Sequence, residues 1–179
     1  MRIIREHISN KKIVLQMKSW RNHFAADELK EIIAIALNRT ICETNTRLKG
    51  YFITDWRIYL VLNVSHKHEN EFVDHFLNEM HQILIKYAND FNELELYFHE
   101  KDLYNNIKNL FRYYHFFDVR LYRLLIGEKD TTTFDDPTTA EMRAYLANYK
   151  YSSYLNYKGD KGPVIFPISK HRIRRRRER

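Results

Sequence analysis

The chain is poor in the residues that carry redox, metal and nucleotide chemistry. Its 179 residues include one cysteine, Cys42, which can form neither an internal disulfide nor a thiol pair for zinc. We expect Cys42 to be a small buried hydrophobe on a helix. Only four glycines are present, and none forms a glycine-rich phosphate-binding loop. These absences disfavour nucleotide-dependent chemistry and predict that no cofactor is needed.

Long apolar runs are missing as well. No stretch approaches the roughly 20 apolar residues that cross a bilayer, and the first residues, MRIIREHISNKK, are too charged for the apolar part of a signal peptide. The chain is 44% hydrophobic and 15% aromatic, which is enough apolar surface to form a core. We therefore expect a folded, soluble, cytoplasmic protein with no membrane partner.

Positive charge is concentrated at the C-terminal end. The chain carries 30 Lys and Arg against 23 Asp and Glu, a net charge of +7, and residues 170–179 alone contribute +6 (seven basic residues and Glu178). Such a block repels itself and pairs with phosphates. We predict a domain over residues 1–165, a disordered basic tail over residues 166–179, and nucleic acid as the partner. A solubilising end, a membrane-surface patch and a nuclear localisation signal stay open as alternatives. The tail residues expected to contact phosphates are Arg172, Arg174, Arg175, Arg176 and Arg177.

The hydrophobic spacing predicts an α+β fold. Apolar residues recur at helical spacing over residues 27–41 and 68–89, whereas β-rich runs with turn signals between them predict strands over residues 12–18, 49–54, 57–64 and 93–99. Ser9 and Asn10 are expected to form a turn. The order β-α-β-β-α-β is that of a ferredoxin-like antiparallel sheet with helices on one face. A helical C-terminal extension follows, with one helix through Leu103–Tyr114 and another that starts at Asp136 and Pro137.

The strand over residues 57–64 has two different faces. Side chains alternate across a strand, so Ile58, Leu60, Leu62 and Val64 share the face expected in the core. Arg57, Tyr59, Val61 and Asn63 lie on the other face, which is free to carry a site.

Three segments resemble a known family. The stretch NYKYSSYLNYKG at residues 148–159 resembles the Tyr-Arg-Trp-Ser-Ser-Tyr-x-x-Tyr-x-Gly signature of REP-associated tyrosine transposases, in the insertion sequence 200-like family. KYANDFN at residues 86–92 is similar to the family's Arg-Tyr-x-x-Tyr-Phe-Asn stretch, which would make Tyr87 its nucleophile, and HFAADELKEIIAIAL is similar to the family's first helix. The matching positions in the first stretch are Tyr149, Tyr151, Ser152, Ser153, Tyr154, Tyr157 and Gly159.

The resemblance implies a chemistry that this chain lacks in part. In the family, a His-hydrophobic-His triplet on a strand binds a divalent metal, and the tyrosine forms a 5′-phosphotyrosine link. Here Arg57 and Tyr59 stand at the two histidine positions, and neither side chain is a normal ligand for Mg²⁺ or Mn²⁺. Metal-dependent cleavage is therefore not expected. Mg²⁺ or Mn²⁺ would bind only at a relocated site, for which His66 and His68 are the candidates. Their alternative is an exposed polar entry into the second helix, with Ser65 as its cap.

Tyr87 also has two interpretations. It lies on the apolar stripe of the second helix, so it is either an amphipathic core-edge residue or a retained nucleophile. If the resemblance holds, Tyr87 should face Arg57 and Tyr59 in one open cleft.

A chain without the two metal-binding histidines can still bind nucleic acid. Arg57 and Tyr59 could contact a phosphate. Five further basic residues lie on expected helices rich in tyrosine: Lys86, Lys108, Arg112, Arg120 and Arg123. Core packing is the alternative role for those tyrosines. We expect a transposase-like DNA-binding protein, nucleoid-associated, for single-stranded or hairpin DNA. An active tyrosine strand transferase and a non-nucleic-acid interaction protein are the alternatives, and a homodimer stays open.

Overall fold

The computed structural model describes residues 7–90, 110–128 and 136–166. Its four strands form one antiparallel sheet in the order β2-β3-β1-β4. The strands are β1 (Ser9–Met17), β2 (Leu48–Ile53), β3 (Arg57–Val64) and β4 (Phe111–His115). The helices are η1 (Ser19–His23), α1 (Ala26–Thr44), α2 (His66–Asp90), α4 (Val119–Leu125), α5 (Pro137–Ala147) and α6 (Ser153–Lys158). This strand order and connectivity confirm the α+β, ferredoxin-like prediction.

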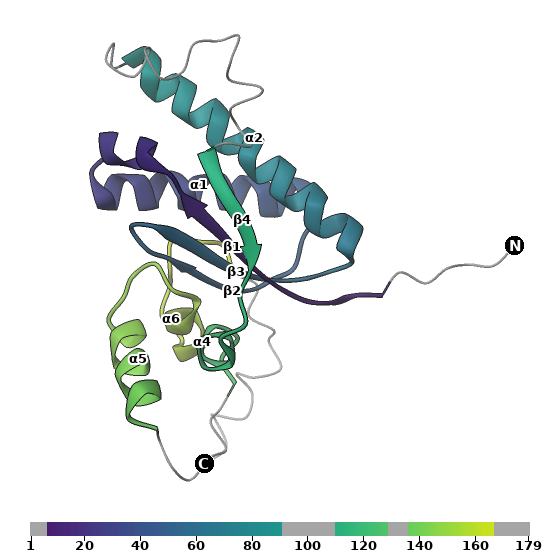
Figure 1. Ribbon diagram of the computed structural model, residues 1–179, viewed down its shortest axis with the longest axis vertical. Coiled ribbons are helices and arrows are strands. Elements are labelled where there is room, and N and C mark those ends of the chain that lie inside the picture. Colours follow the sequence, from purple (N-terminus) through teal and green to yellow (C-terminus); the bar gives the residue numbers. More distant parts are fainter. Residues whose placement is uncertain (1–6, 91–109, 129–135, 167–179) are drawn as a thin grey trace, which may run out of the picture.

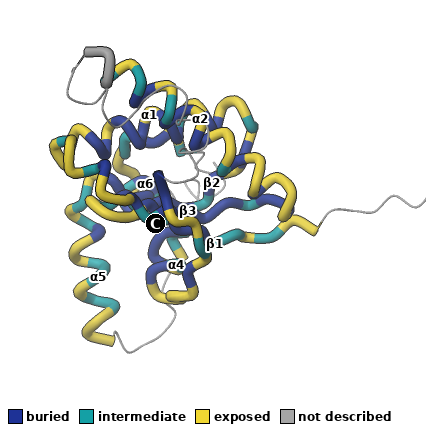
Figure 2. The backbone as a smooth tube through the Cα atoms, turned by 45° about the horizontal axis from the view of Figure 1, so that its top comes forward, coloured by how far each residue is buried: buried dark blue, intermediate teal, exposed yellow. Residues whose placement is uncertain are grey.

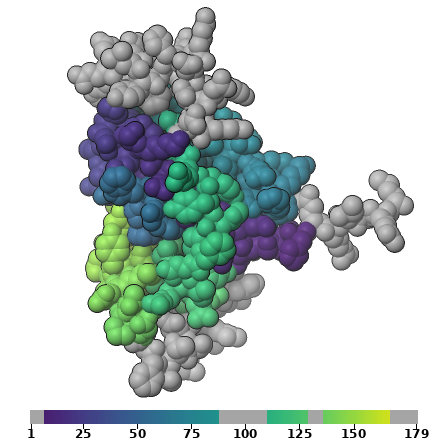
Figure 3. Space-filling model, viewed as in Figure 1, coloured from purple at the N-terminus to yellow at the C-terminus, as the bar shows by residue number. Residues whose placement is uncertain are grey.

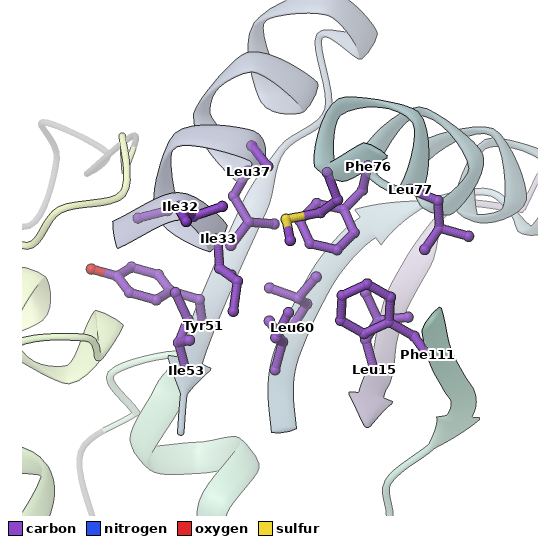
Figure 4. Packing of buried hydrophobic residues seen from close by; sticks show 14 of the residues in the cluster. Leu15, Ile32, Ile33, Leu37, Tyr51, Ile53, Leu60, Phe76, Leu77 and Phe111 are labelled. Atoms are coloured by element: carbon purple, nitrogen blue, oxygen red, sulfur yellow. The ribbon is translucent and has the colours of Figure 1, made fainter. Parts of the chain in front are cut away.

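Helices α1 and α2 cover one face of the sheet (Figure 1). The larger core lies beneath them, because the predicted inward face of β3 packs against the apolar stripes of both helices. In Figure 4, Leu15, Leu60 and Phe111 from three strands lie opposite Leu37 of α1 and Phe76 of α2. The periodicity of the sequence thus predicted this layer correctly, including both helices and the β2–β3 hairpin.

The C-terminal extension covers part of the other face of the sheet (Figure 1). A second core forms there, where Val14 of β1 and Val61 of β3 lie beneath helices α4–α6. Val61 was expected on a free face, and that expectation is wrong, because its side chain is fully buried. The tube in Figure 2 shows buried segments on the helices as well as along the strands. The members contributed by the extension are Phe116, Leu121, Leu124, Leu125, Leu146 and Tyr154.

Three local predictions need correction. The described part of the predicted helix through Leu103–Tyr114 contains strand β4, whose residues Phe111–His115 pair with β1. Ser9 and Asn10 lie in β1 rather than in a turn. Cys42 is on α1 as predicted, but it is exposed. The strand predicted over residues 93–99 lies outside the described residues, so the fourth strand of the described sheet is β4.

Residues 151–153, within the stretch that resembles the family signature, attach the C-terminal extension to the edge strand β2. The amide of Ile53 donates to the carbonyl of Tyr151 (3.0 Å), and Phe52 forms a β-bridge with Ser152. The buried hydroxyl of Ser153 accepts from the amide of Tyr51 (2.9 Å) and donates to the carbonyl of Leu125 (2.8 Å). These residues therefore hold α6 and α4 against β2.

Within the described residues, no helix combines the length and the apolar composition needed to cross a membrane.

Candidate nucleic-acid interface

Two rows of side chains cross the face of the sheet that carries α4–α6. Gln16 of β1 pairs with Arg57 on β3 and with Arg112 on β4. Side chains of directly paired residues lie on the same face of a sheet. Arg57, Gln16 and Arg112 therefore form one row, although the sequence placed Arg112 on a helix.

The second row is aromatic. Val14 pairs with Tyr59 and with Tyr114, so both tyrosines neighbour the first row. The ring of Tyr59 stacks on Phe52 (centroids 5.6 Å apart) and meets Phe116 edge-on, also at 5.6 Å. Phe52 in turn contacts Tyr145 and Tyr149. These aromatic rings, which range from the buried Phe116 to the exposed Tyr145, form a floor beside the arginine row.

The arginines of the first row are exposed and positively charged. Nη1 of Arg57 lies 3.4 Å from the hydroxyl of Tyr59, and this contact raises the pKa of Arg57. Gln16 is half-buried between the two arginines. Among the described residues, no carboxylate forms an ion pair with Arg57 or Arg112. Figure 3 shows that the segment from β4 into α4 lies on the molecular surface, beside the C-terminal helices. We call Arg57, Gln16, Arg112, Tyr59 and Tyr114 the sheet-face site.

Other predicted binding residues are placed elsewhere. Arg120 on α4 forms an ion pair with Asp136 at 2.7 Å, which occupies part of its guanidinium. Arg123 lies 3.8 Å from Glu128, and Lys86 is exposed on α2. The predicted tail residues and Lys108 lie outside the described residues.

Tyr87 does not join the sheet-face site. It packs half-buried against the larger core, with its ring 6.2 Å from that of Phe24, whereas Tyr59 packs on the second core across the sheet. The expectation that Tyr87, Arg57 and Tyr59 share one open cleft is therefore wrong. The core-edge interpretation matches this placement, and a nucleophilic role for Tyr87 stays a prediction without a shared cleft.

The two candidate metal ligands have hydrogen-bonding partners at the start of α2. Nδ1 of His66 lies 3.4 Å from Oε2 of Glu69, and Nδ1 of His68 lies 2.8 Å from the hydroxyl of Ser65. Both histidines are exposed. Within the described ranges, no three His, Cys, Asp or Glu side chains are arranged to hold a metal ion.

Glu69 is the centre of a polar cluster that the sequence did not reveal. Its carboxylate is buried, and Oε1 lies 2.6 Å from Nε2 of His115 and accepts from the hydroxyl of Tyr113. Burial raises the pKa of Glu69, but the bonds from Tyr113, His115 and His66 outweigh it and hold the pKa below its ordinary value. Burial and Glu69 together raise the pKa of Tyr113. Tyr113 and His115 are more than 40 residues from Glu69 in sequence, so no local pattern signals these two contacts.

Comparisons with known proteins find a distant structural likeness. No family model matches the chain, and no curated protein matches it. A crystal structure described as a "putative transposase" from Deinococcus radiodurans R1 is similar over 83% of this chain and 97% of that chain. The identity is 14% and the TM-score is 0.41, so the likeness is a distant one.

Proposed function

We propose that this protein binds single-stranded or hairpin DNA through the sheet-face site, as a transposase-like DNA-binding protein without metal-dependent cleavage. One observation carries the proposal: Arg57 and Arg112 flank Gln16 in a row next to Tyr59 and Tyr114. Cations beside aromatic rings suit the backbone contacts and base stacking of single-stranded nucleic acid.

The geometry supports contacts to more than one phosphate. Neighbouring strands lie about 4.8 Å apart, so β3 and β4, which flank β1, are separated by roughly 10 Å. Two exposed arginines at that separation can bind different phosphates, and each guanidinium offers a planar fork of donors. The amide of Gln16 lies between them and can donate to a phosphate or a base. Phosphate contacts of this kind position a strand without reading its sequence.

The catalytic part of the resemblance found in the sequence is not kept, because Tyr87 packs on the larger core, across the sheet from Arg57 and Tyr59, and only its DNA-binding part enters this proposal. Arg57 and Tyr59 stand at positions where the tyrosine transposases carry metal-binding histidines, so the site would keep a phosphate and lose the metal that polarises it. The basic residues of the predicted tail would add non-specific affinity.

Charge-neutral variants of the arginine row test the proposal. In the full chain, the double variant R57Q/R112Q should bind a single-stranded or hairpin DNA more weakly than the wild type. With a slope of about 0.7 per phosphate contact, losing two contacts should lower the magnitude of the salt slope by about 1.4. The measurement is fluorescence anisotropy of a labelled oligonucleotide over a range of salt concentrations.

The matched control is R47Q/K67Q, which removes the same charge at exposed positions near the opposite end of β3. Equal losses in the two double variants would show that net charge alone governs binding. No binding by the wild type at low salt would contradict the proposal and favour the interaction-protein alternative.

Cleavage is tested separately. We expect a labelled single strand to stay intact with Mn²⁺, and its binding to be unaffected by a chelator. A covalent DNA adduct at Tyr87 that disappears in Y87F would instead support the active strand transferase.

A further inference from the structure

Trp56 is a large apolar side chain that the fold leaves exposed. The chain has two tryptophans. Trp20 is 6% exposed and its indole donates to the carbonyl of Leu110 at 2.7 Å, as expected for a buried indole. Trp56 is 58% exposed at the turn between β2 and β3. It directly precedes Arg57 of the sheet-face site.

The backbone around Trp56 is fixed. The hydroxyl of Thr54 lies 3.3 Å from the amide of Trp56 and 2.9 Å from the amide of Arg57, in position to accept from both. The carbonyl of Trp56 accepts from the amide of Met17 on β1 at 2.9 Å. The exposed ring is therefore held on an ordered turn. Less conformational entropy is lost when this turn binds a ligand than when a flexible loop does.

The ring is also oriented from one side. The guanidinium of Arg21 lies over it, 2.9 Å from the ring centroid, in a cation–π contact. Nη1 of Arg21 lies 3.5 Å from the carbonyl of Asp55, whose carboxylate pairs with the buried Lys30 at 2.8 Å. The turn thus presents an aromatic surface backed by a cation.

We propose that Trp56 is a stacking platform for one unpaired base, with Arg21 behind the ring and Arg57 binding an adjacent phosphate. The inference rests on the proposed function and makes the substrate class more specific, because only a strand with an unstacked base can use such a platform. Stacking on an aromatic ring tolerates every base, so we expect affinity for single strands with little sequence preference from this contact.

Tryptophan fluorescence and affinity provide two independent readouts in the full chain. A single-stranded thymidine oligomer should quench the emission of Trp56, whereas a blunt duplex should not. In W56L, which removes the ring and keeps an apolar side chain, affinity for the oligomer should fall about 5- to 150-fold, and duplex affinity should not change. W56F keeps a smaller ring and should lose less affinity than W56L.

The control F117L removes another exposed ring, from a position that is 80% exposed. Equal losses in F117L and W56L would overturn the inference, as would equal losses for single strand and duplex. Binding that is lost in R57Q/R112Q but unchanged in both W56L and W56F would overturn the Trp56 platform and leave the proposed function intact. No binding by the wild type would overturn both. If W56L does not fold, the inference is tested by two other measurements: the quenching of wild-type emission by the oligomer, and the affinity of W56F for the oligomer.

Discussion

Glu69 shows how one buried carboxylate can remain ionised. Burial opposes its negative charge, yet Tyr113, His115 and His66 all place a hydrogen-bonding group against its oxygens. The bonds to Tyr113 and His115 join the start of α2 to strand β4, at the edge of the sheet. The cluster therefore contributes to the placement of β4 as well as to the local charge balance.

The substitution Glu69→Gln should destabilise the protein at neutral pH, by about 1.5–3 kcal/mol, the range for hydrogen bonds to a charged group. The folded pKa of Glu69 lies below its unfolded value of about 4.5. Its contribution is therefore present above pH 4.5 and is lost as the pH falls through the folded pKa. Urea unfolding of both proteins at several pH values between 3 and 7 should show the difference shrinking below about pH 4.5.

Glu71→Gln is the control, since Glu71 is an exposed carboxylate two residues further along α2. Its effect should stay within about 0.5 kcal/mol. A Glu69→Gln effect that is independent of pH would show that shape rather than charge explains the cost.

Individual residues of the site were predictable in different degrees. Alternation along β3 was enough to place Arg57 and Tyr59 on one face. Gln16 and Trp56 carried no signal of their own, because their importance comes from strand register and from Arg21, which is 35 positions away from Trp56 in sequence. Strand pairing and long-range contacts bring such residues together. The hydrophobic periodicity of one sequence does not show which distant residues will be neighbours.

The edge strand β2 depends on an element that comes much later in the chain. The backbone of Tyr151 and Ser152 lies along β2, and the hydroxyl of Ser153 bonds to β2 and to the end of α4. Covering an edge in this way removes a surface on which another chain could pair. The residues that resemble a family signature therefore act as structural contacts.

The substitution Ser153→Ala should destabilise the protein by about 1–3 kcal/mol, because it leaves a buried amide of Tyr51 and a buried carbonyl of Leu125 without a partner. Urea denaturation monitored by circular dichroism measures the change. Ser19→Ala, at an exposed position on η1, is the control and should be nearly neutral. Equal, small effects would mean that the hydroxyl of Ser153 does not hold this joint.

Helices and strands were predicted correctly where one hydrophobic periodicity extended over many residues. The prediction was wrong where a short segment fitted both the helical and the strand periodicity. Helices α1 and α2 each show an apolar stripe over several turns, and both were predicted. In β4, Phe111 and Tyr114 are three positions apart, as in a helix, while Phe111 and Tyr113 also alternate, as in a strand. Five residues are too few to separate the two periods, and pairing with β1 decides.

Charge is distributed unevenly over the whole chain, with +6 of the net +7 in residues 170–179. Removing these residues should weaken DNA binding and lower the magnitude of the salt slope by up to roughly 4, at about 0.7 for each of six lost contacts. The midpoint of thermal unfolding should hardly change, because a block of like charge adds self-repulsion rather than packing. Anisotropy titrations of both chains and a thermal melt measure these effects.

Combining the truncation with R57Q/R112Q separates the two cationic regions. If they contact different phosphates, their effects on the salt slope should add. An unchanged slope after truncation would mean that residues 170–179 do not touch DNA and would favour a targeting role for them.

The joint between Tyr51 and Ser153 also sets an order of events during synthesis. The two residues are 102 positions apart. At a translation rate of 5–20 residues per second, Ser153 is made about 5–20 s after Tyr51. Once β3 has been made within that interval, the hairpin of β2 and β3 has an outer edge that residues 151–153 do not yet cover. Nascent chains on neighbouring ribosomes are therefore most exposed to mispairing in this window, and slower translation of residues 52–153 would lengthen it.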